Sequence, residues 1–185
     1  MRKLVYSMLV SLDGYVTAPE GGLEWARPDE DLHRVANEEE RETELTLYGR
    51  RMWETMAAHW PTADQDMESP EYEREFARIW QASEKVVFSK SLDEVSGNTR
   101  LVRDDPVEEI RKLKDQHGGP MSIGGPTLAA GAIRAGLVDE FRLFLHPVVL
   151  GGGLPFLPPL DEPLELTLVD EQRLASGVTY LTYVT

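Results

Sequence analysis

The stretch Met121-Ser122-Ile123-Gly124-Gly125-Pro126-Thr127-Leu128 joins a short apolar run to a helix-like segment through two glycines. Glycine has no Cβ, so the backbone at this junction can come close to a ligand. The first N–H groups of the following helix have no partner inside the helix, and the helix dipole adds positive potential there. The junction therefore predicts an anion site, typically for phosphate, although a simple tight turn would also use Gly-Gly-Pro.

Apolar strands and helical segments alternate along the chain before and after this junction. Strands are predicted at residues 3–10, 45–48, 85–88 and 121–124, and helices at residues 31–44, 50–59, 70–80, 105–117 and 127–135. Ser69 is the expected cap of the third helix, with Pro70 at its first position. Further strands follow at residues 138–150, 164–169 and 178–184, with Pro147 inside the first as a bulge or edge position. This order predicts a single α/β domain over residues 1–185, with a mainly parallel central sheet and antiparallel C-terminal strands.

The composition narrows the possible partners. The net charge is −14 over 185 residues, so binding to nucleic acid, which draws on a basic surface, is not expected. No run approaches the roughly 18–20 apolar residues of a membrane span, and the N-terminus shows no signal peptide. The absence of cysteine fits a cytoplasmic protein. The 4 histidines show no paired ligand spacing, so no metal site is expected either.

Three strand exits carry residues suited to phosphate. Gly49-Arg50-Arg51 places two guanidinium groups on the first helical turn after a strand, where each can hold two phosphate oxygens. Ser89 and Lys90 follow the next buried strand, and the Gly-Gly junction is the third exit. Ligands of open α/β sheets bind at the carboxyl ends of strands, so the exits together predict a dinucleotide with an additional phosphate. A surface arginine pair and an ordinary polar turn are the alternatives for the first two exits.

These segments resemble the dihydrofolate reductase fold family in order and spacing. The matching segments are Gly49-Arg50-Arg51-Met52-Trp53-Glu54, Val86-Val87-Phe88-Ser89-Lys90 and Ile123-Gly124-Gly125. Two further segments are similar to the branch that contains the reductase domain of riboflavin biosynthesis and its stand-alone relatives: Ser11-Leu12-Asp13-Gly14 and His146-Pro147-Val148-Val149-Leu150-Gly151. The resemblance implies a three-layer sandwich and a homodimer, to which the long apolar strand from Phe141 to Leu150 would contribute.

The same resemblance implies NADPH as cofactor and hydride transfer to a small heterocyclic or conjugated carbonyl substrate. Arg50 and Lys90, with Ser89 beside them, would hold the 2′-phosphate. The pyrophosphate would meet the segment after Gly49 and the second glycine-rich turn, namely Arg51, Gly124, Gly125, Pro126, Thr127 and Leu128. The nicotinamide would lie against the turn after the first strand, namely Val10, Leu12 and Gly14.

Departures from the branch leave other functions open. Ile123 stands where riboflavin-pathway reductases carry Glu, and Tyr15 where they carry Lys, and both positions would grip a ribose phosphate. Met52 replaces a threonine that is frequent in the family. One alternative is 5-amino-6-(5-phosphoribosylamino)uracil reductase activity in riboflavin synthesis. The other is an NADPH-binding sensor without turnover.

Asp13 and His146 are the candidate catalytic residues. A carboxylic acid whose pKa is raised by burial can give a proton, and Asp13 ends the first strand. An Asx-turn cap at Asp13 and a satisfied core histidine at His146 are the alternatives. The substrate pocket is expected to include Tyr15, Trp25, Asp31 and Trp53. For Asp31 an ordinary surface carboxylate is the alternative, and for the tryptophans it is core packing.

Overall fold

The computed structural model describes residues 1–26 and 28–185, in which eight strands form one sheet with the order β4-β3-β2-β5-β1-β6-β8-β7. The strands are β1 (Leu4–Ser11), β2 (Leu45–Gly49), β3 (Glu84–Phe88), β4 (Thr99–Val102), β5 (Met121–Gly124), β6 (Glu140–His146), β7 (Thr167–Arg173) and β8 (Thr179–Val184). The strands from β4 to β6 in this order are parallel, and β8 is antiparallel to both of its neighbours. The predicted mainly parallel sheet with antiparallel C-terminal strands is confirmed.

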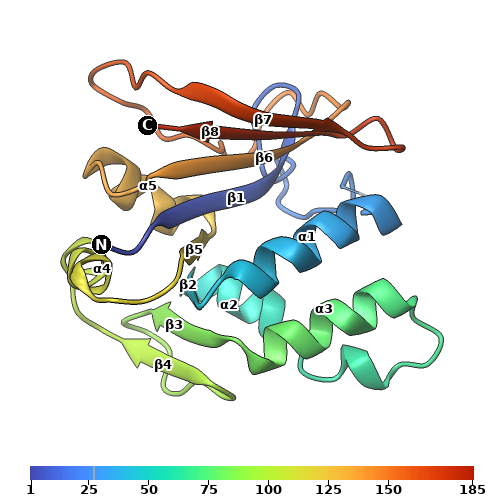
Figure 1. Ribbon diagram of the computed structural model, residues 1–185, viewed down its shortest axis with the longest axis horizontal. Helices are drawn as coiled ribbons and strands as arrows, with labels where there is room; N and C mark the ends of the chain where they lie inside the picture. The colour runs from blue at the N-terminus through green and yellow to red at the C-terminus, as the bar shows by residue number, and fades with distance from the viewer. Residues whose placement is uncertain (27) are drawn as a thin grey trace.

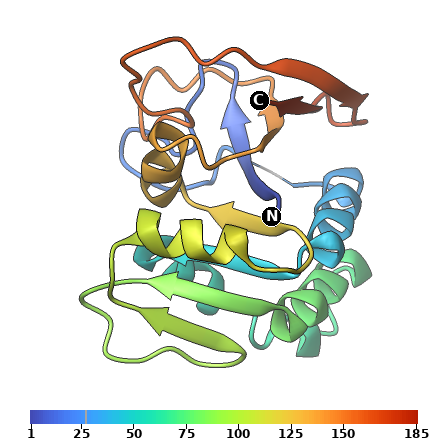
Figure 2. The same cartoon turned by 60° about the vertical axis from the view of Figure 1, so that its left-hand side comes forward.

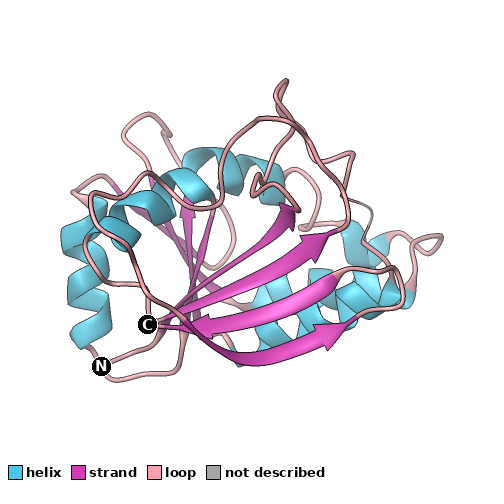
Figure 3. Cartoon of the chain, turned by 90° about the horizontal axis from the view of Figure 1, so that it is seen from above, coloured by secondary structure: helices cyan, strands magenta, loops and turns pink. Residues whose placement is uncertain are grey.

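Helices cover both faces of this sheet, so the fold has three layers. The helices are α1 (Glu30–Glu42), α2 (Arg50–Ala57), α3 (Glu71–Ala82), α4 (Pro106–Asp115) and α5 (Pro126–Arg134). Figures 1 and 2 show α1 and α3 on one face and α4 and α5 on the other, and Figure 3 shows the strands twisting between them. Trp53 of α2 stacks on Trp80 of α3. Within the described residues, no helix has the length and apolar character needed to cross a membrane.

Capping residues and prolines near the helix N-termini determine where helices begin, and one predicted cap differs from the structure. Asp105 caps α4 by accepting a hydrogen bond from the N–H of Val107 at 2.9 Å, with a proline at the first helical position. The expected cap of α3 is wrong. The hydroxyl of Ser69 donates to Asp66 at 3.0 Å instead, and Pro70 is itself the N-cap residue.

The neighbouring strands β1 and β5 pair over a short distance only. Their register runs from Leu4–Met121 to Tyr6–Ile123, and β5 ends one residue later. On its other side β1 stays paired with β6 as far as Ser11. From Ser7 onward, β1 therefore has no neighbouring strand on the β5 side among the described residues, and the sheet opens there at the carboxyl ends of its strands.

The C-terminal third departs most from the sequence prediction. β6 ends at His146, so Pro147 follows the strand and is neither a bulge nor an edge position within it. β6 also pairs with β1 on one side and β8 on the other. A strand paired on both sides offers no open edge, so residues 141–146 could contribute to a dimer contact only through side chains on the faces of the sheet, and that contribution stays a prediction. The open edges of the sheet belong to β4 and β7, and the homodimer itself stays a prediction.

The short strand β4 is not predicted by the sequence. It has four residues, of which only Leu101 and Val102 are apolar, so no period can be read from it. It matters for the site because it adds a further parallel strand, and therefore a further strand exit, next to β3.

Candidate cofactor and substrate cleft

The carboxyl ends of six parallel strands lie side by side at one edge of the sheet. Across that edge, from β4 to β6, the strands end at or just before Arg103, Ser89, Gly49, Gly124, Ser11 and His146. Neighbouring strands are about 4.8 Å apart, so the exits of β3 and β1 are separated by about 14 Å. The three exits predicted to hold phosphate belong to β3, β2 and β5, which are consecutive neighbours.

The Gly-Gly junction is required by the protein's own packing. Gly125 is the N-cap residue of α5 and has φ 95°, a backbone conformation that L side chains rarely adopt. A Cβ at Gly124 would lie 2.7 Å from a ring carbon of Tyr48, so only glycine fits there. Met52, which replaces the family threonine, packs beside both glycines, and its Cβ would lie 3.3 Å from a Cβ at Gly125. This methionine supplies packing where a threonine would supply a hydroxyl.

The donors available to an anion at this junction are backbone groups. Pro126 is the first residue of α5 and has no N–H. Thr127 and Leu128 follow in the first turn, where an N–H group has no acceptor inside the helix. Pro126 can therefore take part only by directing the chain, while Thr127 and Leu128 can each donate a hydrogen bond.

The predicted arginine pair lies at the start of α2, one strand away from the Gly-Gly junction. Gly49 precedes the helix as N-cap residue. The Arg50 guanidinium contacts Glu54 one turn later, with 3.0 Å between Nη1 and Oε1. Exposed pairs of this spacing contribute only about 0.3–0.5 kcal/mol, so a phosphate can displace Glu54. Arg51 is exposed and forms no ion pair with the described residues.

The loop after β3 carries a second group of cations. The Ser89 hydroxyl accepts from the N–H groups of Ser91 (3.2 Å) and Leu92 (3.1 Å), which shapes the loop around the exposed Lys90. Arg103, at the exit of β4, donates to the backbone oxygen of Lys90 at 3.3 Å. Sequence reasoning missed Arg103, because the strand that positions it was not predicted. With Arg50, these residues form a basic cluster at the exits of β4, β3 and β2.

Asp13 anchors the turn after β1. Its carboxylate accepts hydrogen bonds from the Ser11 hydroxyl (2.7 Å) and from the backbone N–H groups of Leu150 (3.1 Å) and Gly151 (2.7 Å). The Ser11 hydroxyl is the main cause of a lowered pKa at Asp13, with the two backbone N–H groups adding to it. A lowered pKa does not favour proton donation, so the hydrogen bonds support the alternative role of Asp13 as a turn anchor, and its catalytic role stays a prediction. Its carboxylate ties the first turn to the loop after β6.

The residues predicted to face a nicotinamide, Val10, Leu12 and Gly14, differ in their exposure to solvent. The Val10 side chain is 1% exposed and lies in the core, while Leu12 is 61% exposed. The Gly14 oxygen accepts from the N–H of Phe156 at 2.9 Å, which holds this glycine against the later loop. Backbone groups alternate in direction along a strand. The backbone oxygen of Leu4 accepts a hydrogen bond from the N–H of Asp139, on the β6 side of β1. Leu9 is an odd number of positions further along the strand, so its N–H and C=O point to the other side, toward the opening beside β5. Sequence reasoning missed Leu9, because only the strand pairing shows this opening.

His146 lies at the exit of β6 beneath the start of α1. Its Nδ1 is 2.9 Å from the backbone oxygen of Phe144, and its ring meets Trp25 edge to face at 5.2 Å. Burial lowers the pKa of His146, and the Phe144 carbonyl and the Asp29 carboxylate offset this in part. Asp29 is the N-cap residue of α1 and accepts from the N–H of Leu32 at 2.9 Å.

His33, one turn into α1, was also missed by sequence reasoning. Its ring lies among Trp60, Tyr72 and Phe76. Burial lowers the pKa of His33 as well, with Glu73 and Asp29 acting in the opposite direction. Three of the five buried side-chain atoms that lack a hydrogen-bond partner within the described residues belong to Trp25, His33 and His146. An unpaired polar atom is costly to bury, so this grouping marks the start of α1 as a candidate ligand site.

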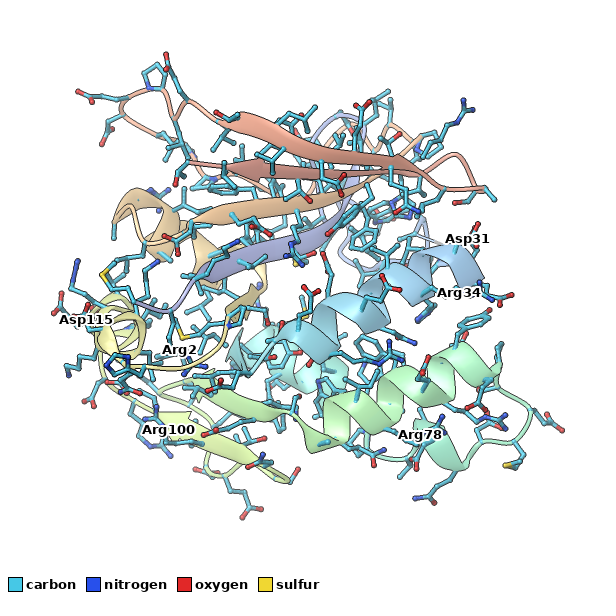
Figure 4. All side chains as sticks on the ribbon, viewed as in Figure 1. Arg2, Asp31, Arg34, Arg78, Arg100 and Asp115 are labelled. Atoms are coloured by element: carbon cyan, nitrogen blue, oxygen red, sulfur yellow. The ribbon has the colours of Figure 1, made fainter. Side chains whose placement is uncertain are left out.

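Other predicted pocket residues lie elsewhere. Trp53 is buried and stacked on Trp80 at 5.8 Å, so it is a core residue and no pocket wall. Asp31 borders a groove with Arg34 and Gln172, and Figure 4 shows it beside Arg34 at the outer end of α1. Asp29, two residues earlier, is the acid that acts on His146. Tyr15 donates its backbone N–H to the Ser11 hydroxyl at 2.9 Å, which places it in the anchored turn.

Comparison with known proteins agrees with this arrangement. The RibD C-terminal domain family matches residues 2–180. The chain is 31% identical over 183 residues to uncharacterized protein YyaP of Bacillus subtilis (strain 168), which covers 98% of this chain and 94% of that protein. The crystal structure of a putative riboflavin biosynthesis protein from Shewanella sp. PV-4 superposes with a TM-score of 0.74 at 21% identity, over 98% of each chain. Dihydrofolate reductase from Enterococcus faecalis, solved with NADP(H), gives a TM-score of 0.61 at 20% identity, over 98% of this chain and 95% of that one. The chain therefore belongs to the RibD C-terminal domain family and has the dihydrofolate reductase fold.

Proposed function

We propose that this protein is an NADPH-dependent reductase that transfers hydride to a small heterocyclic or conjugated carbonyl compound. One observation carries the proposal. Groups suited to phosphate, to a carboxamide and to a polar planar ring follow one another at the exits of consecutive strands. Cations and hydroxyls stand at β4, β3 and β2, a helix start at β5, open backbone on β1 and a buried histidine at β6. That is the order in which a bound dinucleotide and its substrate would present their own groups.

The phosphate half of the cleft fits NADPH in charge and in donors. In a chain with a net charge of −14, Arg50, Arg51, Lys90 and Arg103 gather at neighbouring exits, and only Arg50 among them is paired with a carboxylate in the described structure. We assign Arg50, Lys90 and Ser89 to the 2′-phosphate, because charged and hydroxyl donors suit its oxygens. Arg51 and the α5 N-terminus then serve the pyrophosphate.

The opening between β1 and β5 suits the nicotinamide. Leu9 offers one backbone donor and one backbone acceptor there, which is the complement of a carboxamide group. The turn from Ser11 to Gly14 is held by Asp13 and by the loop at Leu150 and Gly151, so it would form a fixed wall of the opening. Bound NADPH supplies the hydride, and the protein supplies orientation and the exclusion of water.

The more specific reaction of riboflavin synthesis finds no support at the two positions where the chain departs from that branch. Ile123 is 1% exposed and packs in the core between β1 and β2, so it offers nothing polar to a ribose phosphate. Tyr15 belongs to the anchored turn and brings no cation. We therefore propose the broader reductase activity. Failure to rescue a strain that lacks the uracil reductase step would agree with this choice, and rescue would overturn it.

A binding titration followed by a turnover assay tests the proposal. We expect saturable NADPH binding, seen as enhanced cofactor fluorescence, and NADPH oxidation with at least one member of a panel of pterins, pyrimidinones, quinones and enones. Lys90→Ala should weaken NADPH binding, while Arg78→Ala, on the outer side of α3 (Figure 4), serves as the control for loss of one surface cation. Failure to bind NADPH would overturn the proposal. Tight binding without oxidation across the panel would replace the reductase by the sensor.

A further inference from the structure

Arg103 follows the last residue of β4 and is exposed, but its guanidinium group contacts backbone oxygens and no carboxylate of the described residues. Nη1 donates to the oxygen of Lys90 and Nη2 to the oxygen of Asp93, each at 3.3 Å. The chain has 33 acidic residues, so an exposed arginine has many possible partners of opposite charge. The two backbone contacts therefore indicate that Arg103 acts on the shape of the loop after β3.

Lys90 lies in this loop between two fixed points. The N–H of Ser89 donates to the oxygen of Val102 at 3.0 Å, which joins the start of the loop to β4. Beyond Lys90, the N–H of Leu92 donates to the Ser89 hydroxyl at 3.1 Å. Arg103 holds the backbone oxygen of Lys90 itself. The main chain is therefore held on both sides of Lys90, while the side chain of Lys90 stays exposed.

A guanidinium group suits this task. Its N–H groups lie in one rigid plane, so a single arginine can hold two oxygens at a set separation, which the single nitrogen of a lysine does not reproduce. The two oxygens belong to residues three positions apart, so the contacts close a short segment of the loop. A segment that is ordered before a ligand arrives loses less conformational freedom on binding, which raises affinity. Arg103 can therefore strengthen phosphate binding without touching the phosphate.

We propose that Arg103 is a positioning residue for the 2′-phosphate of NADPH. It holds the loop from Ser89 to Asp93 in the shape that directs the Lys90 ammonium group toward the phosphate oxygens, and it thereby raises the preference for NADPH over NADH. The inference rests on the proposed NADPH-dependent function and adds a residue that acts through Lys90. A direct contact between Arg103 and the phosphate is the competing explanation, and the two differ in how substitutions combine.

Calorimetric titration with NADPH and NADH tests this role. Arg103→Ala should weaken NADPH binding about tenfold and leave NADH binding within about twofold, since NADH has no 2′-phosphate. Arg103→Lys keeps the charge but loses the fork, so we expect nearly the same loss. In protein that already carries Lys90→Ala, adding Arg103→Ala should change NADPH affinity by less than about twofold, because the side chain to be positioned is gone.

Hydrogen exchange in the cofactor-free protein gives a second measurement. We expect Arg103→Ala to speed exchange of the Leu92 amide, whose hydrogen bond depends on the loop shape, while the amide of Val87 within β3 keeps its rate. Arg100→Ala is the matched control, because Arg100 is exposed on β4 (Figure 4) and pairs with Glu109 of α4 at 3.1 Å. This variant should change neither cofactor affinity nor exchange in the loop.

Four outcomes would overturn the positioning role. Two are unchanged NADPH affinity and unchanged exchange at Leu92 in Arg103→Ala. The others are full NADPH affinity in Arg103→Lys and losses that add in the double variant, and both would assign Arg103 a direct charge contact with the phosphate. Failure of the unaltered protein to bind NADPH would be a failure of the proposed function, and it would remove this inference as well.

Discussion

The two halves of the proposed site, one for the cofactor and one for the substrate, hold their polar groups in opposite ways. In the cofactor half, at the exits of β4, β3, β2 and β5, the cations are exposed and the backbone donors stand at a helix start. In the substrate half, around the exits of β1 and β6 and the start of α1, polar atoms of Trp25, His33 and His146 are buried without partners. Exposed cations are kept at little cost to stability, whereas buried unpaired atoms oppose folding. Substitution of the exposed cations should therefore weaken binding without lowering stability. Substitution of the buried unpaired groups should impair the substrate site while stability stays the same or rises.

The glycine junction is where the cofactor half should be most sensitive. Gly125→Ala places a side chain at φ 95°, which costs about 1–3 kcal/mol of unfolding free energy. We also expect NADPH affinity to fall about 100-fold or more, because two hydrogen bonds from backbone to phosphate, each about 1.5–3 kcal/mol, lose their geometry. Gly136→Ala is the matched control, since Gly136 has φ 64° and open space around an added Cβ. Calorimetry and urea unfolding should show lower stability in both variants and weaker binding in Gly125→Ala alone.

The exposed cations should affect binding without affecting stability. Lys90→Ala and Arg50→Ala are each expected to cost about 1.5–3 kcal/mol of NADPH binding, the range for a hydrogen bond to a charged partner. Their melting temperatures should match that of the unaltered protein, because both side chains are exposed. Binding of NADH, which lacks the 2′-phosphate, should hardly change. Unaltered NADPH affinity in both variants would show that the 2′-phosphate lies elsewhere.

The substrate half should show the reverse behaviour. His146→Leu removes a buried polar atom that has no partner but also frees the Phe144 oxygen, so we expect the unfolding free energy to stay the same or rise by about 1 kcal/mol. NADPH affinity should not change, while turnover of any substrate found should fall. A variant that is clearly less stable would mean that the histidine is a structural core residue after all, and the contrast between the halves would disappear.

Acidification should give the smallest effect and should act on the substrate half. Burial lowers the pKa of His33 and His146 below the ordinary value of 6.5, so the unfolded chain binds protons that the folded chain does not. The contribution of these two neutral histidines to the free energy of unfolding is therefore fully present above about pH 6.5. It decreases as the pH falls toward the pKa values of the folded state. A variant with His33→Phe and His146→Leu should lose less stability between about pH 7 and pH 5.5. Urea unfolding at both pH values measures the difference, and equal losses would contradict it.

The same division explains what the sequence could predict. The cofactor half is built from continuous segments, in which a strand, a glycine and a charged or hydroxyl residue follow one another within a few positions. The strand exits at Arg50, Lys90 and Gly124-Gly125 could therefore be predicted, whereas the exit at Arg103 was missed with its short strand. The binding roles of these residues stay predictions. The order of elements along the chain also predicted the parallel sheet, because strands and helices alternate up to α5.

The substrate half is assembled from segments that are distant in the chain. The roles of Asp29, His33 and Leu9 depend on pairing and on helix position, which no local pattern shows. The anchoring contacts of Asp13 could not be predicted for the same reason, because its partners at Leu150 and Gly151 are more than 130 positions away. Asp31 borders a groove with Arg34, and its contact with a substrate stays a prediction.

The brief pairing of β1 with β5 also bears on how the molecule deforms. Three residue pairs join these strands, against seven between β1 and β6, so β1 is held unevenly on its two sides. The strand exits proposed to hold phosphate lie on the β5 side of β1, and His146 lies on the β6 side. A dinucleotide bound across the exits of β5 and β1 would connect the two strands beyond the end of their pairing and so restrain their relative motion. Amide hydrogen exchange in β1 should then slow more on cofactor binding than exchange in β2 or β8.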